Sequence, residues 1–164
     1  MNANAYQELC EYNERITRID RQLHELCREN VSYQRLMEIP GVGPVIGAAL
    51  ISELGDGSQF SNGRQMSAWC GLVPRQHSSG DRTVSLGITK NGNKQLRTLL
   101  IHGARAVVFR RKADGGSLSR WINRLVERRG AHKAIVALAN KLARICWAVI
   151  RFEQSYKQNR AFVG

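Results

Sequence analysis

The chain has 164 residues, of which 43% are hydrophobic, so it is long enough for one ordinary core and its composition argues against disorder. No apolar run approaches the roughly 18 residues of a membrane span, and the first residues are polar, so we expect a soluble, cytoplasmic protein with no membrane partner. The net charge of +12 favours a polyanionic partner.

The charge is divided unevenly along the chain. Residues 1–60 hold 5 basic and 9 acidic residues, whereas residues 61–164 hold 20 basic and 4 acidic residues. Such a basic body favours a nucleic acid, because each phosphate that is neutralised releases condensed counterions. The alternative is a solvated basic surface that only keeps the protein soluble.

The N-terminal stretch has the pattern of a long amphipathic helix, with no Gly or Pro before Pro40. Its apolar residues alternate spacings of three and four, as in the a/d seam of a coiled coil. The predicted seam is Leu9, Tyr12, Ile16, Ile19, Leu23, Leu26, Asn30 and Tyr33. Asn30 would be the polar residue that fixes register. We expect residues 1–35 to form a coiled-coil helix that assembles a homo-oligomer, or one that packs inside a helical bundle of the same chain.

Residues 36–54 have the form of a helix-hairpin-helix, with an apolar helix end, a glycine turn and a second helix. Gly41 and Gly43 allow a tight turn, and Pro44 suits the first turn of a helix because its missing N–H would be unpaired there. Backbone N–H groups at such a turn bind DNA phosphate. The alternative is a hairpin that serves only to pack the two helices.

Two short elements follow this hairpin. Ser61 is the predicted N-cap of a short helix that ends at Gly71. The β-branched runs at 73–77 and 83–88 then bracket Ser79-Gly80-Asp81, which predicts a small β-hairpin or an extended loop.

Three further helices complete a compact helical domain over residues 36–154. They are expected at about 94–111, 117–129 and 132–153. The last has the wide apolar face of a central core helix. We therefore predict a mainly α fold with at most one short β-hairpin, followed by a polar tail at residues 155–164.

The four cysteines, Cys10, Cys27, Cys70 and Cys146, lie far apart in apolar-periodic sequence. None forms a C-x-x-C motif or stands at metal-ligand spacing from a histidine. We expect reduced, buried thiols and no metal site in this chain.

Ser78 and Ser79 are adjacent hydroxyl residues in a segment bounded by Gly71 and Gly80. We take this segment as the candidate catalytic site. A serine becomes a nucleophile when a base, a metal or positive charge stabilises its alkoxide. No G-x-S-x-G elbow or acidic partner supports acyl chemistry, whereas nearby cations favour a phosphodiester as electrophile, with His77 as a candidate proton shuttle. The alternative is the simple turn chemistry of a Ser-Ser-Gly loop.

The candidate nucleic-acid-binding residues combine the glycine turn with the charged residues near the serines. They are Gly41, Gly43, Arg75, His77, Arg82, Lys90, Lys94, Arg97 and Arg105. Arg97 and Arg105 are included because they fall away from the apolar residues of their predicted helix and could face a ligand.

Three segments, Gly71–Gly80, Leu86–Asn93 and Leu96–Ala106, closely resemble the C-terminal transposase domain of the insertion sequence 110 family, in its 1111-like subgroup. The segment Ile39–Leu50 resembles the start of that domain. The heptad helix resembles the coiled coil that precedes it, so the resemblance covers essentially the whole chain.

The resemblance implies a DNA transposase or recombinase whose serine nucleophile forms a covalent phosphoserine link during strand exchange, guided by a structured bridge RNA. The family serine maps into Ser78-Ser79. Ser79 is favoured because it directly precedes the glycine, and Ser78 is the alternative.

The sequence departs from the family in one respect. Complete members resemble a two-part enzyme, in which an N-terminal RuvC-like domain supplies four acidic residues that bind magnesium. We expect no such domain before Met1, and Asp81, Asp114, Glu127 and Glu153 are too scattered to replace it. We expect a serine-bearing half that is inactive alone and needs carboxylates from another domain or chain. The alternative is a non-catalytic nucleic-acid-binding and oligomerisation module with inert serines.

Overall fold

The computed structural model describes residues 3–79, 82–112 and 115–157, and for residues 3, 76–79 and 82–86 it describes the backbone alone. Within these ranges, seven helices and one two-stranded sheet confirm the predicted mainly α fold. The helices are α1 (Ala3–Cys27), α2 (Val31–Met37), α3 (Pro44–Leu54), α4 (Gly63–Trp69), α5 (Lys94–Arg110), α6 (Ser117–Arg129) and α7 (Ala131–Arg151), and the strands are β1 (Pro74–Ser79) and β2 (Arg82–Ile88). No helix in the described ranges is long and apolar enough to cross a lipid bilayer.

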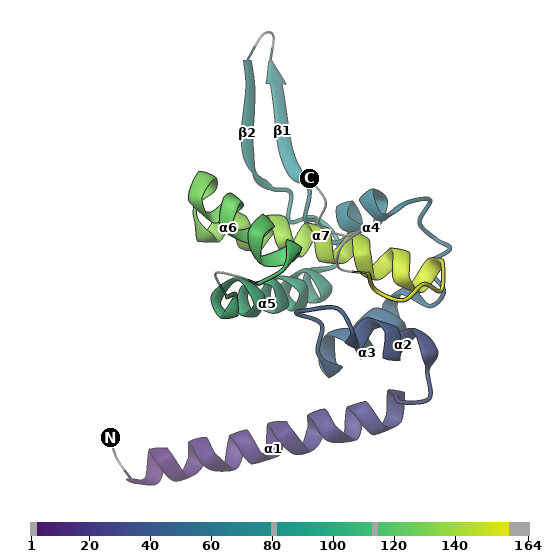
Figure 1. The fold of residues 1–164 in the computed structure, drawn as a ribbon, viewed down its shortest axis with the longest axis vertical. Coiled ribbons are helices and arrows are strands. Elements are labelled where there is room, and N and C mark those ends of the chain that lie inside the picture. The colour runs from purple at the N-terminus through teal and green to yellow at the C-terminus, as the bar shows by residue number, and fades with distance from the viewer. Residues whose placement is uncertain (1–2, 80–81, 113–114, 158–164) are drawn as a thin grey trace.

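The body of the molecule is built around α7. Helices α2, α4, α5 and α6 all pack against it (Figure 1). Leu138, Leu142 and Cys146 on its apolar face are almost completely buried. Each buried aliphatic side chain stabilises a fold by about 1.5–3 kcal/mol, so this face holds the other helices in place.

The N-terminal helix projects from this body (Figure 1) and ends earlier than expected. The predicted seam continued through Asn30 to Tyr33, but α1 ends at Cys27. Asn30 instead has a ψ of 112° and is the N-cap of α2, where its Oδ1 accepts a hydrogen bond from the Tyr33 N–H at 3.0 Å. Asparagine side chains compete for backbone N–H groups in this way, which favours caps over helix interiors. Tyr33 is fully buried in the body.

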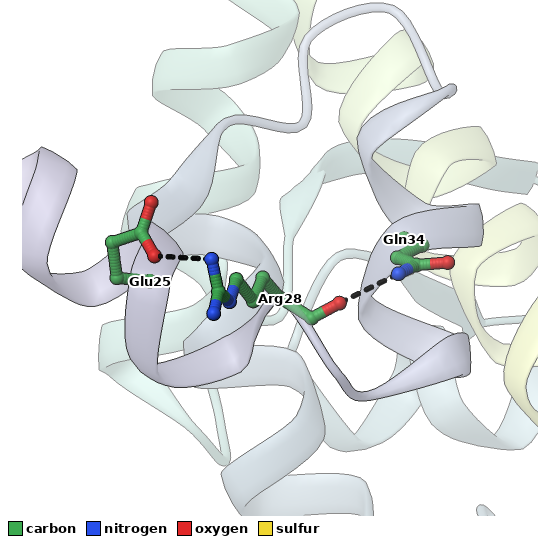
Figure 2. Close-up of polar contacts among 3 residues, drawn as sticks. All are labelled: Glu25, Arg28 and Gln34. Carbon is green, nitrogen blue, oxygen red and sulfur yellow. Dashed lines mark hydrogen bonds and ion pairs between the residues drawn. The ribbon is translucent and has the colours of Figure 1, made fainter.

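A short polar network braces the bend between α1 and α2 (Figure 2). The Arg28 guanidinium pairs with the Glu25 carboxylate at 3.0 Å, and the Arg28 carbonyl accepts a hydrogen bond from Gln34 Nε2 at 2.6 Å. The Tyr33 hydroxyl lies 3.2 Å from His24 Nδ1. The ion pair is exposed and contributes little by itself, but together these contacts join the last turn of α1 to the first turn of α2.

Most of the predicted seam of α1 is exposed. Leu9, Tyr12, Ile16 and Ile19 are 50–62% exposed, and Leu26 is 83% exposed. Leu23 and Cys27, near the body, are partly buried. A continuous row of exposed apolar side chains on one helix face is typical of a surface that meets another helix.

Helices α2 and α3 are joined by a glycine turn that packs on α5. Pro44 occupies the first turn of α3, as predicted. Gly41 has a φ of 90°, and a Cβ on Gly103 of α5 would come within 2.1 Å of the Gly41 carbonyl oxygen. Because neither position accepts a side chain, the turn meets α5 backbone against backbone.

The short helix α4 is capped one residue later than predicted. Asn62, not Ser61, is the N-cap, and its Oδ1 accepts a hydrogen bond from the Gln65 N–H at 3.0 Å. Gln65 Oε1 accepts one from the Ser61 N–H at 2.6 Å. Ser61 therefore takes part in the same reciprocal arrangement, one residue outside the cap.

The central stretch forms the predicted β-hairpin. Strands β1 and β2 pair antiparallel from Pro74 opposite Ile88 to Ser79 opposite Arg82, with a register shift after Pro74. The hairpin stands away from the helical body on the side opposite α1 (Figure 1). Because an isolated two-stranded ribbon is only marginally stable in water, its position depends on how its base is attached to the body.

The four cysteines match the prediction only in part. All are free, as expected. Cys70 and Cys146 are fully buried, and burial raises the pKa of each thiol to about 12. Cys10 and Cys27 lie on the projecting helix, where most of the described side chains are exposed, and both are only partly buried.

The predicted polar tail begins with a residue that packs. Tyr156 lies against the hydrophobic core, and burial raises the pKa of its hydroxyl to about 12. Residues 158–164 of the predicted tail lie outside the described residues.

Because the glycine turn contacts α5 closely, a methyl group added at this contact should lower the stability of the protein more than one added elsewhere. Gly103→Ala should lower the free energy of unfolding by about 1–3 kcal/mol, because the new methyl group overlaps the Gly41 carbonyl oxygen. Gly87→Ala is the control, since a Cβ there meets nothing within 4 Å, and its effect should stay within about 0.5 kcal/mol. Urea unfolding followed by circular dichroism measures both, and equal losses would contradict the close approach.

Candidate nucleic-acid interface

The two candidate serines are the last two residues of β1, next to the hairpin apex. The backbone pairs here are Ser79 with Arg82, Ser78 with Thr83, and His77 with Val84. Successive residues of a strand belong to opposite faces of a ribbon. By register, the positions of His77, Ser79 and Arg82 therefore share one face, and the position of Ser78 is on the other. Gly80 and the side chains of all these residues lie outside the described set.

The base of the hairpin is tied to the body by backbone hydrogen bonds. The Lys90 N–H donates to the Gly71 carbonyl at 3.1 Å, and the Asn93 N–H donates to the Trp69 carbonyl at 3.0 Å. Lys90 has a φ of 58°, a left-handed conformation that costs a lysine about 1–2 kcal/mol. The surrounding hydrogen bonds hold this conformation, so the chain leaves β2 and enters α5 along a fixed path.

Four of the predicted cations have exposed side chains. Arg75, Lys90 and Lys94 lie where the hairpin meets the start of α5, and Arg105 lies farther along that helix. Lys94 and Arg105 share one stripe of α5, because they are three helical turns apart. The Arg105 guanidinium lies over the Phe109 ring, 5.7 Å from the ring centre. The structure thus brings together three of the cations and extends their surface along α5.

Arg97 does not belong to this exposed surface. It was predicted to lie away from the apolar residues of its helix, but its side chain is only 9% exposed. Its Nη1 donates to the Cys70 carbonyl at 3.0 Å. Leu100 and Ala104, three and seven residues later, are completely buried, so this spacing was a signal that Arg97 faces the core. It supports the segment that leads into the hairpin.

The two glycines of the predicted helix-hairpin-helix differ in their surroundings. Gly41 packs closely on the backbone of α5, and it is also partly exposed at the edge of a groove that Arg110 and Arg111 line. Gly43 is the N-cap of α3, where a Cβ would meet nothing within 4 Å and no side chain caps the helix. The turn is therefore open at Gly43 on the side where a Cβ would lie.

One cationic cluster was not predicted. Arg64 on α4 and Lys141 and Arg144 on α7 line a groove on the helical body. The spacing of Lys141 and Arg144 places them on one side of a helix and was visible in the sequence. Their meeting with Arg64 depends on the packing of α4 on α7, which no local pattern reveals.

The described residues offer no set of metal ligands. No group of three or more His, Cys, Asp or Glu side chains among them could hold a metal ion. Glu127 and Glu153 lie on α6 and after α7, and Asp81 and Asp114 lie outside the described residues. The magnesium implied by the family resemblance therefore has no donor set in the described part of the chain, and we derive no step through it.

Comparison with known proteins agrees with the resemblance seen in the sequence. A sequence profile described as "Transposase IS116/IS110/IS902 family" matches residues 33–119, just over half of the chain. The transposase for insertion sequence element IS1111A of Coxiella burnetii is 46% identical over 152 residues, which cover 93% of this chain and 42% of that protein. A probable family 20 transposase of Pseudomonas aeruginosa is 46% identical over 150 residues, covering 92% of this chain and 44% of that protein.

A more distant relative is named for a different rearrangement. A pilin gene-inverting protein of Moraxella lacunata is 33% identical over 160 residues, covering 92% of this chain and 46% of that protein. The chain spans less than half the length of each of these three relatives.

The burial of Arg97 predicts a structural effect that an exposed arginine lacks. Arg97→Met should lower the free energy of unfolding by about 1–3 kcal/mol, because the Cys70 carbonyl loses its donor. Arg105→Gln should cost less than about 1 kcal/mol, since it removes only an exposed contact with an aromatic ring. Thermal unfolding without nucleic acid compares them. If both variants lose the same stability, Arg97 has no special structural role.

Proposed function

Because the chain belongs to the IS116/IS110/IS902 family of transposases, we propose that it is the serine-bearing part of a DNA recombinase. The β-hairpin is the observation that carries this proposal, since its backbone holds Ser79 opposite Arg82 beside the apex. The ribbon rises from a body whose residues 61–164 are strongly basic. The pilin gene-inverting relative fits the same class of reaction, strand exchange in DNA.

In the proposed reaction, Oγ of Ser79 attacks a phosphorus atom of DNA. A phosphoserine ester bond forms, the bond from phosphorus to one deoxyribose oxygen breaks, and this oxygen leaves with the proton that the serine gives up. Arg82 binds the non-bridging oxygens as charge develops on them, and His77 is a candidate to carry the proton. Because the ester retains the bond energy, attack by a deoxyribose hydroxyl can rejoin the DNA.

The backbone register favours Ser79 over Ser78 as the nucleophile. Ser79 pairs with Arg82 and shares a face of the ribbon with the position of His77, whereas Ser78 pairs with Thr83. A nucleophile needs its activating groups on its own side of the ribbon. Ser78 stays the alternative, and the two serines can be tested separately.

Completion of the site requires groups from elsewhere. Carboxylates that bind magnesium would come from another domain or chain, for which the greater length of the relatives leaves room. A magnesium ion held there would supply positive charge that favours cleavage of a phosphodiester. The exposed cations of the hairpin base and of α5 contact the DNA backbone in this proposal, and a structured guide RNA is the second nucleic-acid partner.

Covalent trapping tests the nucleophile. The chain is joined to the part of the Coxiella relative that it does not cover, incubated with magnesium and radiolabelled element-end DNA, and analysed on a denaturing gel. We expect a protein–DNA adduct that Ser79→Ala removes completely and Ser78→Ala leaves largely intact, because Oγ of Ser79 forms the ester.

Each result of the trapping experiment has a distinct meaning. An adduct lost only in Ser78→Ala would move the nucleophile by one residue. An adduct that survives both substitutions, or none with the unaltered serines, would contradict serine catalysis and leave the non-catalytic nucleic-acid-binding and oligomerisation module as the function. Retention of fold in each variant is checked by circular dichroism.

The exposed seam of α1 supports a homo-oligomer as part of this function. Tyr12, Ile16 and Ile19 are each at least half exposed in the single chain. Pairing of this face with the α1 of a second copy would remove these side chains from water at about 25 cal/mol per Å². An assembly of this kind would bring two serine hairpins to one reaction.

Polar substitutions in the apolar seam of α1 should lower the mass of the assembly in solution. The double variant Ile16→Gln/Ile19→Gln should sediment as a monomer of 18.4 kDa, because polar side chains remove the apolar contact. The matched control Asn13→Gln/Thr17→Gln alters the same helix off the seam and should keep the mass of the unaltered chain. Analytical ultracentrifugation measures all three, and an unaltered chain that is itself monomeric would refute the assembly.

A further inference from the structure

A groove between α4 and α7 is lined by cationic side chains that are not part of the proposed site at the serine hairpin. Its volume is about 570 Å³, and Arg64 of α4 and Lys141 and Arg144 of α7 contribute to its walls. Among the described residues that line it there is no carboxylate. The groove therefore concentrates positive charge in a concave site, where field lines focus and attract anions.

The walls of the groove are held by close packing. A Cβ on Gly63 would lie 3.1 Å from the Cα of Arg144, so the start of α4 rests directly on the backbone of α7. The Lys141 ammonium lies over the Trp121 ring, 4.9 Å from its centre, which ties its position to α6. Trp147 Nε1 donates to the Gly57 carbonyl at 3.0 Å. A site formed in advance loses little conformational freedom when a ligand binds.

The charges in the groove repel one another in the free protein. Lys141 and Arg144 are three residues apart on α7 and so lie on one side of the helix. Burial, and then the charge of Arg144, lower the pKa of Lys141. An anion between these groups would relieve the repulsion and favour the charged lysine, which gives the ligand an energetic reason to bind here.

We propose that this groove binds the phosphodiester backbone of a nucleic acid, as a contact separate from the serine hairpin. The side chains of Arg64 and Arg144 are exposed and donate paired hydrogen bonds to phosphate oxygens, while Lys141 adds a point charge. Contacts of this kind position a nucleic acid without reading its sequence. The inference rests on the proposed function only in taking a nucleic acid as the partner.

A run of phosphates suits the groove better than one small anion. Cations reach it from two helices, and the surrounding body is itself strongly basic. Successive phosphates allow each cation to find its own partner, and each contact releases counterions. Duplex DNA and structured RNA share this chemistry, so both serve as probes.

The test compares variants that remove equal charge from different places. Arg64→Gln/Arg144→Gln alters the groove, Arg128→Gln/Arg129→Gln alters the exposed end of α6, and Arg64→Lys/Arg144→Lys keeps the charge of the groove. Binding of a fluorescent DNA duplex and of an RNA hairpin of unrelated sequence is measured from low to moderate salt. Inorganic phosphate is added as a competitor, and circular dichroism checks that each variant is folded.

We expect the groove variant to bind about tenfold more weakly at low salt, with the slope of log affinity against log salt reduced by about 1 for each lost phosphate contact. The α6 variant should change both quantities less, and the lysine variant should retain most of the binding. A preference for DNA or RNA in this loss identifies which backbone occupies the groove. If millimolar phosphate removes the difference in affinity between the unaltered chain and the groove variant, the groove is a site for a single anion. That result would overturn the proposal.

Two further results would also overturn it, and they bear differently on the proposed function. If the groove and α6 variants lose equal affinity, the groove is only part of a diffuse basic surface, while the serine proposal stands. If the unaltered chain binds neither probe, the groove assignment fails as well. The trapping experiment then decides separately whether the complete enzyme uses Ser79.

Discussion

The Arg97 guanidinium joins α5 to the segment that carries the hairpin. It donates to the carbonyl of Cys70, a fully buried residue, and the chain turns immediately afterwards at Gly71, which has a φ of 68°. A Cβ on Gly71 would lie 2.8 Å from Arg97 Nη1 and 2.3 Å from the Asn91 carbonyl oxygen, so three parts of the chain converge on this point. Both strands leave from here, and the location of Ser79 relative to the basic body therefore depends on a contact inside the core.

Local patterns predicted the elements well, and the exceptions have a common physical cause. Three elements were predicted from residues close together in sequence. They are α7 from its apolar periodicity, the β-hairpin from the β-branched runs around residue 80, and the start of α3 from Pro44. The end of α1 was missed because a heptad pattern does not register the competition of the Asn30 side chain for a backbone N–H. A heptad pattern describes the preference of a segment for helix, but a side chain that caps the next helix can end the first one before the pattern does.

The candidate site was less accessible from sequence than the fold. The apolar spacing of the helix was taken to place both Arg97 and Arg105 away from the core, yet Arg97 is buried and Arg105 is exposed, because Arg97 is spaced with the buried Leu100 and Ala104. The groove of Arg64 and Arg144 depends on packing between helices distant in sequence. Adjacent hydroxyls near cations made Ser78 and Ser79 candidates, but a Ser-Ser-Gly turn is common. Their role as nucleophile was implied by the family resemblance and stays a prediction.

The length of the hairpin has a consequence for catalysis. β1 has six residues, and a strand rises about 3.3 Å per residue. The serines therefore lie about 20 Å from the core, near the free end of a ribbon that is attached to the body at its base. A tilt of about five degrees at the base displaces the tip by about 2 Å, whereas a reacting group must be placed to within about 0.5 Å. The fold alone therefore places the proposed nucleophile only approximately, and its final alignment depends on contacts made at the tip of the hairpin.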